Sequence, residues 1–257
     1  MAVQADSAGS ADLRLEAVEP LRPRSSYAEI LNSSAVIAGS SVANIGVGII
    51  RTKLVASVLG PGGFGLFGIY NAVIELAVSI SSLGIGGSAV RQVAEAVGTG
   101  DTNRIARTIY VLRRLSILLG IAGAILLIVF ARQISEVSFG TDEYSSGVAL
   151  LSAVLLFRLL STSQGALLQG MRRIRELAAA QFLGTLLGAI ATVSLVYVWG
   201  EAGIVPSMVA GASIGLLLTW IFTRQICPPP VRLSAAELVT ESAAMVQLGV
   251  AFLVSSV

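Results

Sequence analysis

The chain has 257 residues, of which 54% are hydrophobic and only 12% are charged. A soluble globular domain carries about 25% charged residues, so this composition excludes an ordinary soluble domain and indicates an integral membrane protein. The net charge of +2 gives no indication of a nucleic-acid partner. Histidine is absent and the single cysteine, Cys227, makes neither a zinc cage nor an intrachain disulfide. We therefore expect no metal and no cofactor.

The first 27 residues are polar and of mixed charge, and they include Pro20 and Pro23. This composition predicts a flexible tail over residues 1–27. No apolar core with a cleavage site follows Met1, so we expect no signal peptide.

Six long apolar segments follow the tail, and each is close to the length of about 20 residues that a helix needs to cross a bilayer. They cover residues 33–59, 64–90, 115–131, 147–168, 177–199 and 203–222. Their many glycine and alanine residues favour close helix packing in lipid. The sequence therefore predicts an all-α, polytopic transmembrane helix bundle with six complete spans.

A seventh apolar segment begins near Ser242 and reaches Val257. A weak internal repeat accompanies it, because residues 26–43 align without gaps to residues 234–251. Parallel repeats of this kind are a transporter architecture, with substrate bound between two lobes. We therefore expect a six-helix N-lobe over residues 28–232 and the start of a truncated second lobe over residues 233–257.

The arginines predict the orientation of the bundle. If the N-terminus is cytoplasmic, nearly all arginines outside the spans lie in cytoplasmic segments, and the outer loops hold only Arg132. The positive-inside rule strongly favours this arrangement. Topology alone therefore explains the basic stretches 111–114 and 171–175 better than nucleic-acid or headgroup binding does.

Two cations lie inside the first span, where a charge at the bilayer centre costs roughly 2.5–3.5 kcal/mol. Arg51 shares one helix face with Ser40, Asn44 and Gly48, which precede it at helical spacing. Lys53 lies two residues further on, about 200° around the helix. We expect Arg51 to face the bundle interior and Lys53 to extend outward along its aliphatic stem.

Two further spans carry a charge within a polar stripe. Glu75 shares a face with Asn71 and Ser79, and Arg158 begins a stripe that includes Ser161. Counted from the outer ends, Arg51, Glu75 and Arg158 lie roughly 13–17 Å deep at 1.5 Å per residue.

Two interpretations of these charges are open. Glu75 forms a structural ion pair with Arg51 or Arg158, or the charges face a substrate, which is the common role of ionisable groups inside membranes. We favour a hydrated cationic cavity that binds an anion, because phosphate oxygens suit the arginine fork. The candidate binding residues are Arg51, Arg158, Glu75, Asn44 and Lys53.

Four motifs give the chain a family resemblance from about residue 26 onward. They are RTKLVASVLGPGGFGLFGIY (51–70), SSLGIGGSAVRQVAE (81–95), FGTDEY (139–144) and ALLQGMRRIRELA (166–178). In these motifs the chain resembles the bacterial O-antigen translocases, which are oligosaccharide flippases of the multidrug/oligosaccharidyl-lipid/polysaccharide exporter superfamily. The first motif is also similar to one in the peptidoglycan lipid II flippases, whose first helix places cavity arginines nearby, and this resemblance implies a cavity role for Arg51.

The resemblance implies two six-helix lobes and a location in the bacterial inner membrane. It implies transfer of an undecaprenyl-pyrophosphate-linked oligosaccharide from the cytoplasmic to the periplasmic leaflet, for O-antigen or similar polysaccharide biosynthesis. The expected partners are this polyprenyl pyrophosphate, membrane lipids and other polysaccharide assembly proteins. We expect the genomic sequence beyond Val257 to encode about six more spans.

Other functions are alternatives to this one. A drug or cation exporter, or a lipid II flippase, would share the fold, although exporters of cations tend to use cavity carboxylates and only Glu75 qualifies here. A membrane enzyme usually needs a large outer loop with polar catalytic groups, whereas the outer loops 60–63, about 132–146 and 200–202 are short. A further alternative is an inactive fragment with only a structural role.

Overall fold

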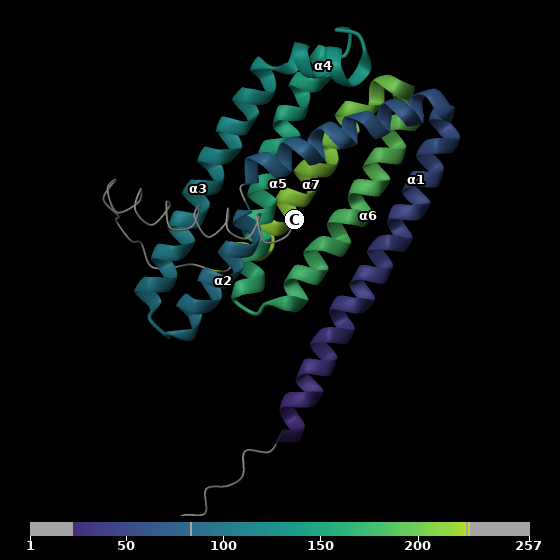
Figure 1. Cartoon of the computed structure of the whole chain (residues 1–257). Coiled ribbons are helices and arrows are strands. Elements are labelled where there is room, and N and C mark those ends of the chain that lie inside the picture. The colour runs from purple at the N-terminus through teal and green to yellow at the C-terminus, as the bar shows by residue number, and fades with distance from the viewer. Residues whose placement is uncertain (1–22, 83, 225, 227–257) are drawn as a thin grey trace, which may run out of the picture.

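The computed structural model describes residues 23–82, 84–224 and 226, and within these ranges it contains helices and no strands (Figure 1). The helices are α1 (Pro23–Ser82), α2 (Ile85–Gly98), α3 (Thr102–Val129), α4 (Ala131–Phe139), α5 (Ser145–Gly170), α6 (Ile174–Trp199), the 3₁₀ helix η1 (Gly200–Gly203) and α7 (Ile204–Thr223). The all-helical architecture predicted from the sequence is therefore confirmed. The predicted second-lobe segment 233–257 and residues 1–22 of the predicted tail lie outside the described residues.

Helix α1 contains the first two predicted spans, joined at a sharp kink. Gly60 has the non-helical angles φ 68° and ψ −176°, a conformation that glycine adopts at little cost. Pro61 follows and lacks the N–H that would continue the helical hydrogen bonds. We call residues 23–59 the first arm and residues 61–82 the second arm. Figure 1 shows the first arm beside α6 and the second arm crossing the bundle towards α2.

Both ends of α1 differ from the predicted boundaries. The helix begins at Pro23, so residues 23–27 of the predicted tail are helical; proline suits a first helical turn because its fixed φ is already helical. The second arm ends at Ser82 rather than continuing to residue 90. Gly84 has a φ of 69°, and the chain starts the separate helix α2 directly after it.

Hydropathy also misplaced the start of α3 and missed α4. The side chain of Asp101 accepts a hydrogen bond from the backbone N–H of Asn103 at 2.9 Å, so α3 is capped there and begins 13 residues before the predicted span. The predicted loop after α3 contains α4. This short helix carries the exposed Arg132–Glu136 ion pair one turn apart, at 3.0 Å, while the hydroxyl of buried Ser135 donates to the Thr141 carbonyl.

Helices α5, α6 and α7 follow the prediction to within a few residues. Segments Ala38–Ser82 and Ile174–Thr223 are 45 and 50 residues long, about twice the length of one crossing. The first is broken at Gly60 and the second at η1. Together with α3 and α5, these segments provide helix length for six crossings, as the sequence predicts.

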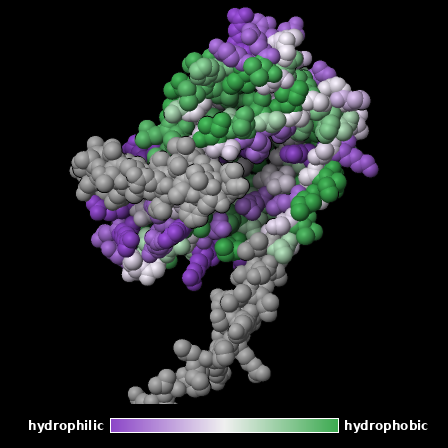
Figure 2. Space-filling view, viewed as in Figure 1, coloured by the Kyte–Doolittle hydropathy of each residue, from purple (hydrophilic) through white to green (hydrophobic). Residues whose placement is uncertain are grey.

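Two apolar clusters hold the helices together. One joins the second arm to α5 and the start of α7 through residues such as Ile74, Leu155 and Ile204. The other joins α2, α3 and α5 through residues such as Val93, Leu112 and Leu168. Figure 2 shows a band of apolar side chains between hydrophilic residues at the α4 end and at the α2–α3 end. A surface of this kind suits a bundle surrounded by lipid.

Candidate functional site

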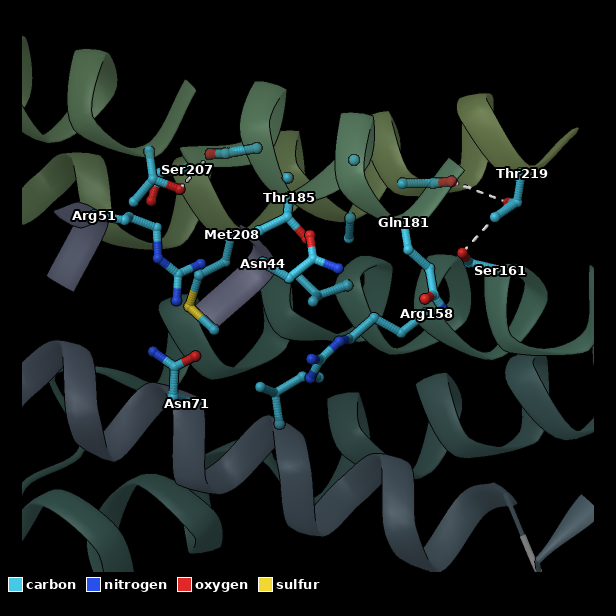
Figure 3. Close-up of a pocket in the computed structure, with 18 of the residues that line it drawn as sticks. Asn44, Arg51, Asn71, Arg158, Ser161, Gln181, Thr185, Ser207, Met208 and Thr219 are labelled. Carbon is cyan, nitrogen blue, oxygen red and sulfur yellow. Dashed lines mark hydrogen bonds between the residues drawn. The ribbon is translucent and has the colours of Figure 1, made fainter. Parts of the chain in front are cut away.

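A cavity of about 490 Å³ lies among α1, α5, α6 and α7. Both arms of α1 contribute to its lining, so the kink at Gly60 is what brings two distant stretches of one helix to a single site. Its polar lining includes two arginines and two asparagines, together with neutral hydroxyl and amide groups from α5, α6 and α7 (Figure 3).

Arg51 and Asn44 line this cavity from the first arm. They are seven residues apart, about two helical turns, so they lie on one face as their spacing predicts. The Nε of Arg51 and the Oδ1 of Asn44 are both buried, and neither has a hydrogen-bond partner within the described ranges. Buried polar groups are normally paired, so these two atoms offer a donor and an acceptor to a ligand or to water.

Arg158 lines the cavity from α5 and is held by Glu75 of the second arm. Its Nη1 donates to Glu75 Oε1 at 2.6 Å. Of the two ion pairs open from the sequence, the structure therefore contains the one with Arg158. The Glu75 side chain is 61% exposed and does not contribute to the cavity lining. Figure 3 shows Arg51, Asn44 and Arg158 pointing into the same space.

Lys53 lies outside this site. Its side chain is exposed, and the residue is not part of the cavity lining. Of the five candidate residues, Asn44, Arg51 and Arg158 thus line the cavity. Glu75 pairs with Arg158 but does not line the cavity, and Lys53 lies on another face of the first arm.

Sequence reasoning missed the side of the cavity formed by α6 and α7. The side chains that line it from α6 are Gln181, Thr185 and Thr192. On the α7 side, the hydroxyl oxygen of Thr219 lies 3.3 Å from that of Ser161 on α5. Four glycines lie between these polar groups, namely Gly184, Gly188, Gly211 and Gly215.

The glycines are paired across the two helices. A Cβ on Gly184 would lie 3.8 Å from the Cα of Gly215, and one on Gly188 would lie 3.7 Å from the Cα of Gly211. The available signal was the spacing of four residues between the two glycines of each helix, 184 and 188 on α6 and 211 and 215 on α7, which is typical of close helix contacts in membranes.

The described ranges contain no group of three or more cysteine, aspartate or glutamate side chains that could hold a metal ion. The charged side chains that line the cavity are those of Arg51 and Arg158. Two guanidinium groups and a single neighbouring carboxylate leave it cationic, and guanidinium forks bind phosphate and carboxylate oxygens in pairs.

The fold and site define a multi-pass helical membrane protein with a cationic cavity among its helices. A family model described as "Polysaccharide biosynthesis protein" matches residues 30–257, and the chain belongs to this family. It is also similar to Protein DETOXIFICATION 24 of Arabidopsis thaliana, with 30% identity over 145 residues. These residues are 53% of this chain and 29% of that protein. No solved structure matches the chain significantly. The two matches confirm the predicted superfamily.

Proposed function

We propose that this chain forms part of a flippase that moves a lipid-linked oligosaccharide across the bacterial inner membrane. The substrate is an undecaprenyl-pyrophosphate-linked repeat unit of O-antigen or a similar surface polysaccharide. The observation that carries the proposal is the cavity arginine Arg51, whose buried Nε has no hydrogen-bond partner among the described residues. Membership of a polysaccharide biosynthesis family supports the same substrate class.

The cavity suits the chemistry of moving a phosphate group through the membrane. A bare phosphate in an apolar medium carries a prohibitive solvation cost. Guanidinium groups replace part of its hydration with charge-assisted hydrogen bonds. The neutral hydroxyl and amide groups of α5–α7 provide partners for sugar hydroxyls, while the polyprenyl tail stays in the bilayer. Transport rather than covalent chemistry is the proposed activity, with membrane lipids and other polysaccharide assembly proteins as partners.

We propose a cytoplasmic N-terminus, which puts the α2–α3 and α5–α6 connections in the cytoplasm and α4 at the periplasmic surface. The arginines near these connections and the isolated Arg132 on α4 support this orientation. In a Cys227→Ser background, a cysteine at Gly98 should react only from the cytoplasmic side and one at Ser145 only from the periplasmic side. Labelling of position 98 from the periplasm would refute the orientation.

Surface-polysaccharide export in a strain lacking the gene tests the function, with the complete gene supplied on a plasmid. Arg51→Ala should abolish export at normal protein level in the membrane, because the buried charge that binds phosphate is gone. Arg51→Lys should keep part of the activity, since it retains the charge but loses the fork. Lys53→Ala should have a milder effect. Normal export by Arg51→Ala, or loss explained by degradation, would reject the substrate role.

The similarity to Protein DETOXIFICATION 24 supports a second candidate, the export of drugs or cations. Cellular accumulation of a cationic dye separates the two functions. An exporter of cations predicts that deleting the gene raises dye accumulation and that Glu75→Gln fails to reverse it. The flippase predicts loss of surface polysaccharide with unchanged dye accumulation.

A further inference from the structure

The two cavity arginines differ in how their charge is compensated. Arg158 has a carboxylate partner at 2.6 Å, whereas Arg51 Nε has no hydrogen-bond partner among the described residues. The carboxylate of Glu75 belongs to a residue that does not line the cavity, although the arginine that it holds does. Arg158 thus pairs with the carboxylate of Glu75 and also lines the cavity.

We propose that Glu75 is a built-in counter-ion that competes with substrate phosphate for Arg158 and keeps the affinity of the cavity moderate. This inference rests on the proposed function and assigns Glu75 a regulatory role rather than that of a substrate ligand. A carrier must release what it binds, and a site with two uncompensated guanidinium groups would hold a pyrophosphate tightly.

The geometry leaves Arg158 able to serve two anions. A guanidinium has five N–H donors, and the hydrogen bond between this pair uses one donor, Nη1, and one acceptor, Oε1. The remaining donors can reach a phosphate oxygen in the cavity without first breaking the ion pair. Glu75 therefore weakens anion binding through its charge while it stays hydrogen-bonded to Arg158.

The position of the pair suits this exchange. The side chains of Arg158 and Glu75 are 40% and 61% exposed, so neither is locked by close packing, in contrast to a buried structural ion pair. Each also belongs to a different helix, α5 and the second arm of α1. The pair therefore links two cavity walls and leaves the Arg158 side chain room to adjust towards a bound phosphate.

The test measures binding of undecaprenyl pyrophosphate to the full chain in lipid nanodiscs. Glu75→Gln removes the competing charge at nearly constant shape, so the dissociation constant should fall about three- to tenfold, as expected for a hydrogen-bonded charge that is partly exposed. Glu75→Asp keeps the charge but shortens the side chain, and it should tighten binding to a smaller extent. The matched control is Glu95→Gln, which breaks the exposed Arg91–Glu95 pair and should change nothing.

The gain should vanish in the double variant Glu75→Gln/Arg158→Gln relative to Arg158→Gln alone, because Glu75 acts through Arg158. Unchanged or weaker binding by both Glu75→Gln and Glu75→Asp, alongside weaker binding by Arg51→Ala, would overturn the counter-ion role and leave the proposed function standing. If neither Arg51→Ala nor Arg158→Gln alters binding, the proposed function itself fails.

Discussion

The two sides of the bundle use glycine in opposite ways. Where α5 meets α2, a Cβ on Gly170 would lie 2.6 Å from the Cβ of Val93, and where α3 meets the second arm of α1, one on Gly123 would lie 2.5 Å from the hydroxyl oxygen of Ser81. On the α6–α7 side, a Cβ on Gly211 would meet nothing within 4 Å. Glycine thus closes one interface and leaves a cavity beside the other.

The difference teaches that small residues in a membrane helix can bring two helices close together and still leave open space beside the contact. Gly170 faces the Val93 side chain and the Val90 carbonyl oxygen of α2, which fill the space beside it. Gly211 and Gly188 face each other across α6 and α7 and line the open site. The residue on the facing helix decides whether the volume that a glycine leaves is filled by a side chain, as at Gly170, or stays open beside a backbone contact, as at Gly211.

The largest effect is expected when the cavity is filled by a side chain introduced at one of the glycines that line it. Gly211→Leu places a branched side chain in the open space, so export should be largely lost while the protein remains folded and inserted. Export complementation with the membrane protein level measured in parallel checks this. Gly46→Leu, which also enters open space but away from the cavity, should export normally. Equal loss in both variants would contradict the assignment.

On the packed side, Gly170→Ala should destabilise the fold. The added methyl group meets Val93 and the Val90 carbonyl oxygen at 2.6 and 3.0 Å, and such overpacking typically costs about 1–3 kcal/mol. Thermal unfolding in detergent measures the loss, with Gly211→Ala as the matched control that should leave the midpoint nearly unchanged. A normal midpoint for Gly170→Ala would show that α2 and α5 are not in close contact.

The hydrogen bond between Thr219 of α7 and Ser161 of α5 should contribute less to stability than the packing at Gly170 does. Thr219 donates or shares hydrogen bonds with Ser161, Gly215 and Leu216, and hydrogen bonds between membrane helices average about 0.6 kcal/mol. Thr219→Val should therefore lower stability by about that amount and also weaken substrate binding. Ser57→Ala removes a comparable backbone contact at an exposed position outside the cavity and should leave binding intact. Identical binding in the two variants would argue against a role for Thr219.

The smallest effect is expected at α4, outside both regions. Arg132 pairs with Glu136 and Asp142, but its side chain is 71% exposed. Exposed ion pairs contribute about 0–1 kcal/mol, so Arg132→Ala should shift the unfolding midpoint by less than Gly170→Ala does. A shift as large as that of Gly170→Ala would reveal a structural role that the contacts do not indicate.

The sequence predicted the helices better than it predicted how they meet. Hydropathy located the apolar segments, and helical spacing placed Asn44 and Arg51 on one face. The sequence could not decide whether Arg51 or Arg158 pairs with Glu75, because the observed Arg158–Glu75 contact joins residues that are 83 positions apart. It also missed the wall around Gly188 and Gly211, because a wall formed by two helices depends on which faces meet. Helix α4 escaped detection because it is short and polar.

The most direct test of the central claim is whether Arg51 lets the protein distinguish a pyrophosphate from the lipid that carries it. Binding of undecaprenyl pyrophosphate and of uncharged undecaprenol is measured on the full chain in nanodiscs. The wild type should prefer the pyrophosphate, and Arg51→Ala should lose about tenfold or more of that preference, as removal of a hydrogen-bonded charge implies. Lys53→Ala should retain it. Equal preference in the wild type and Arg51→Ala would contradict the account.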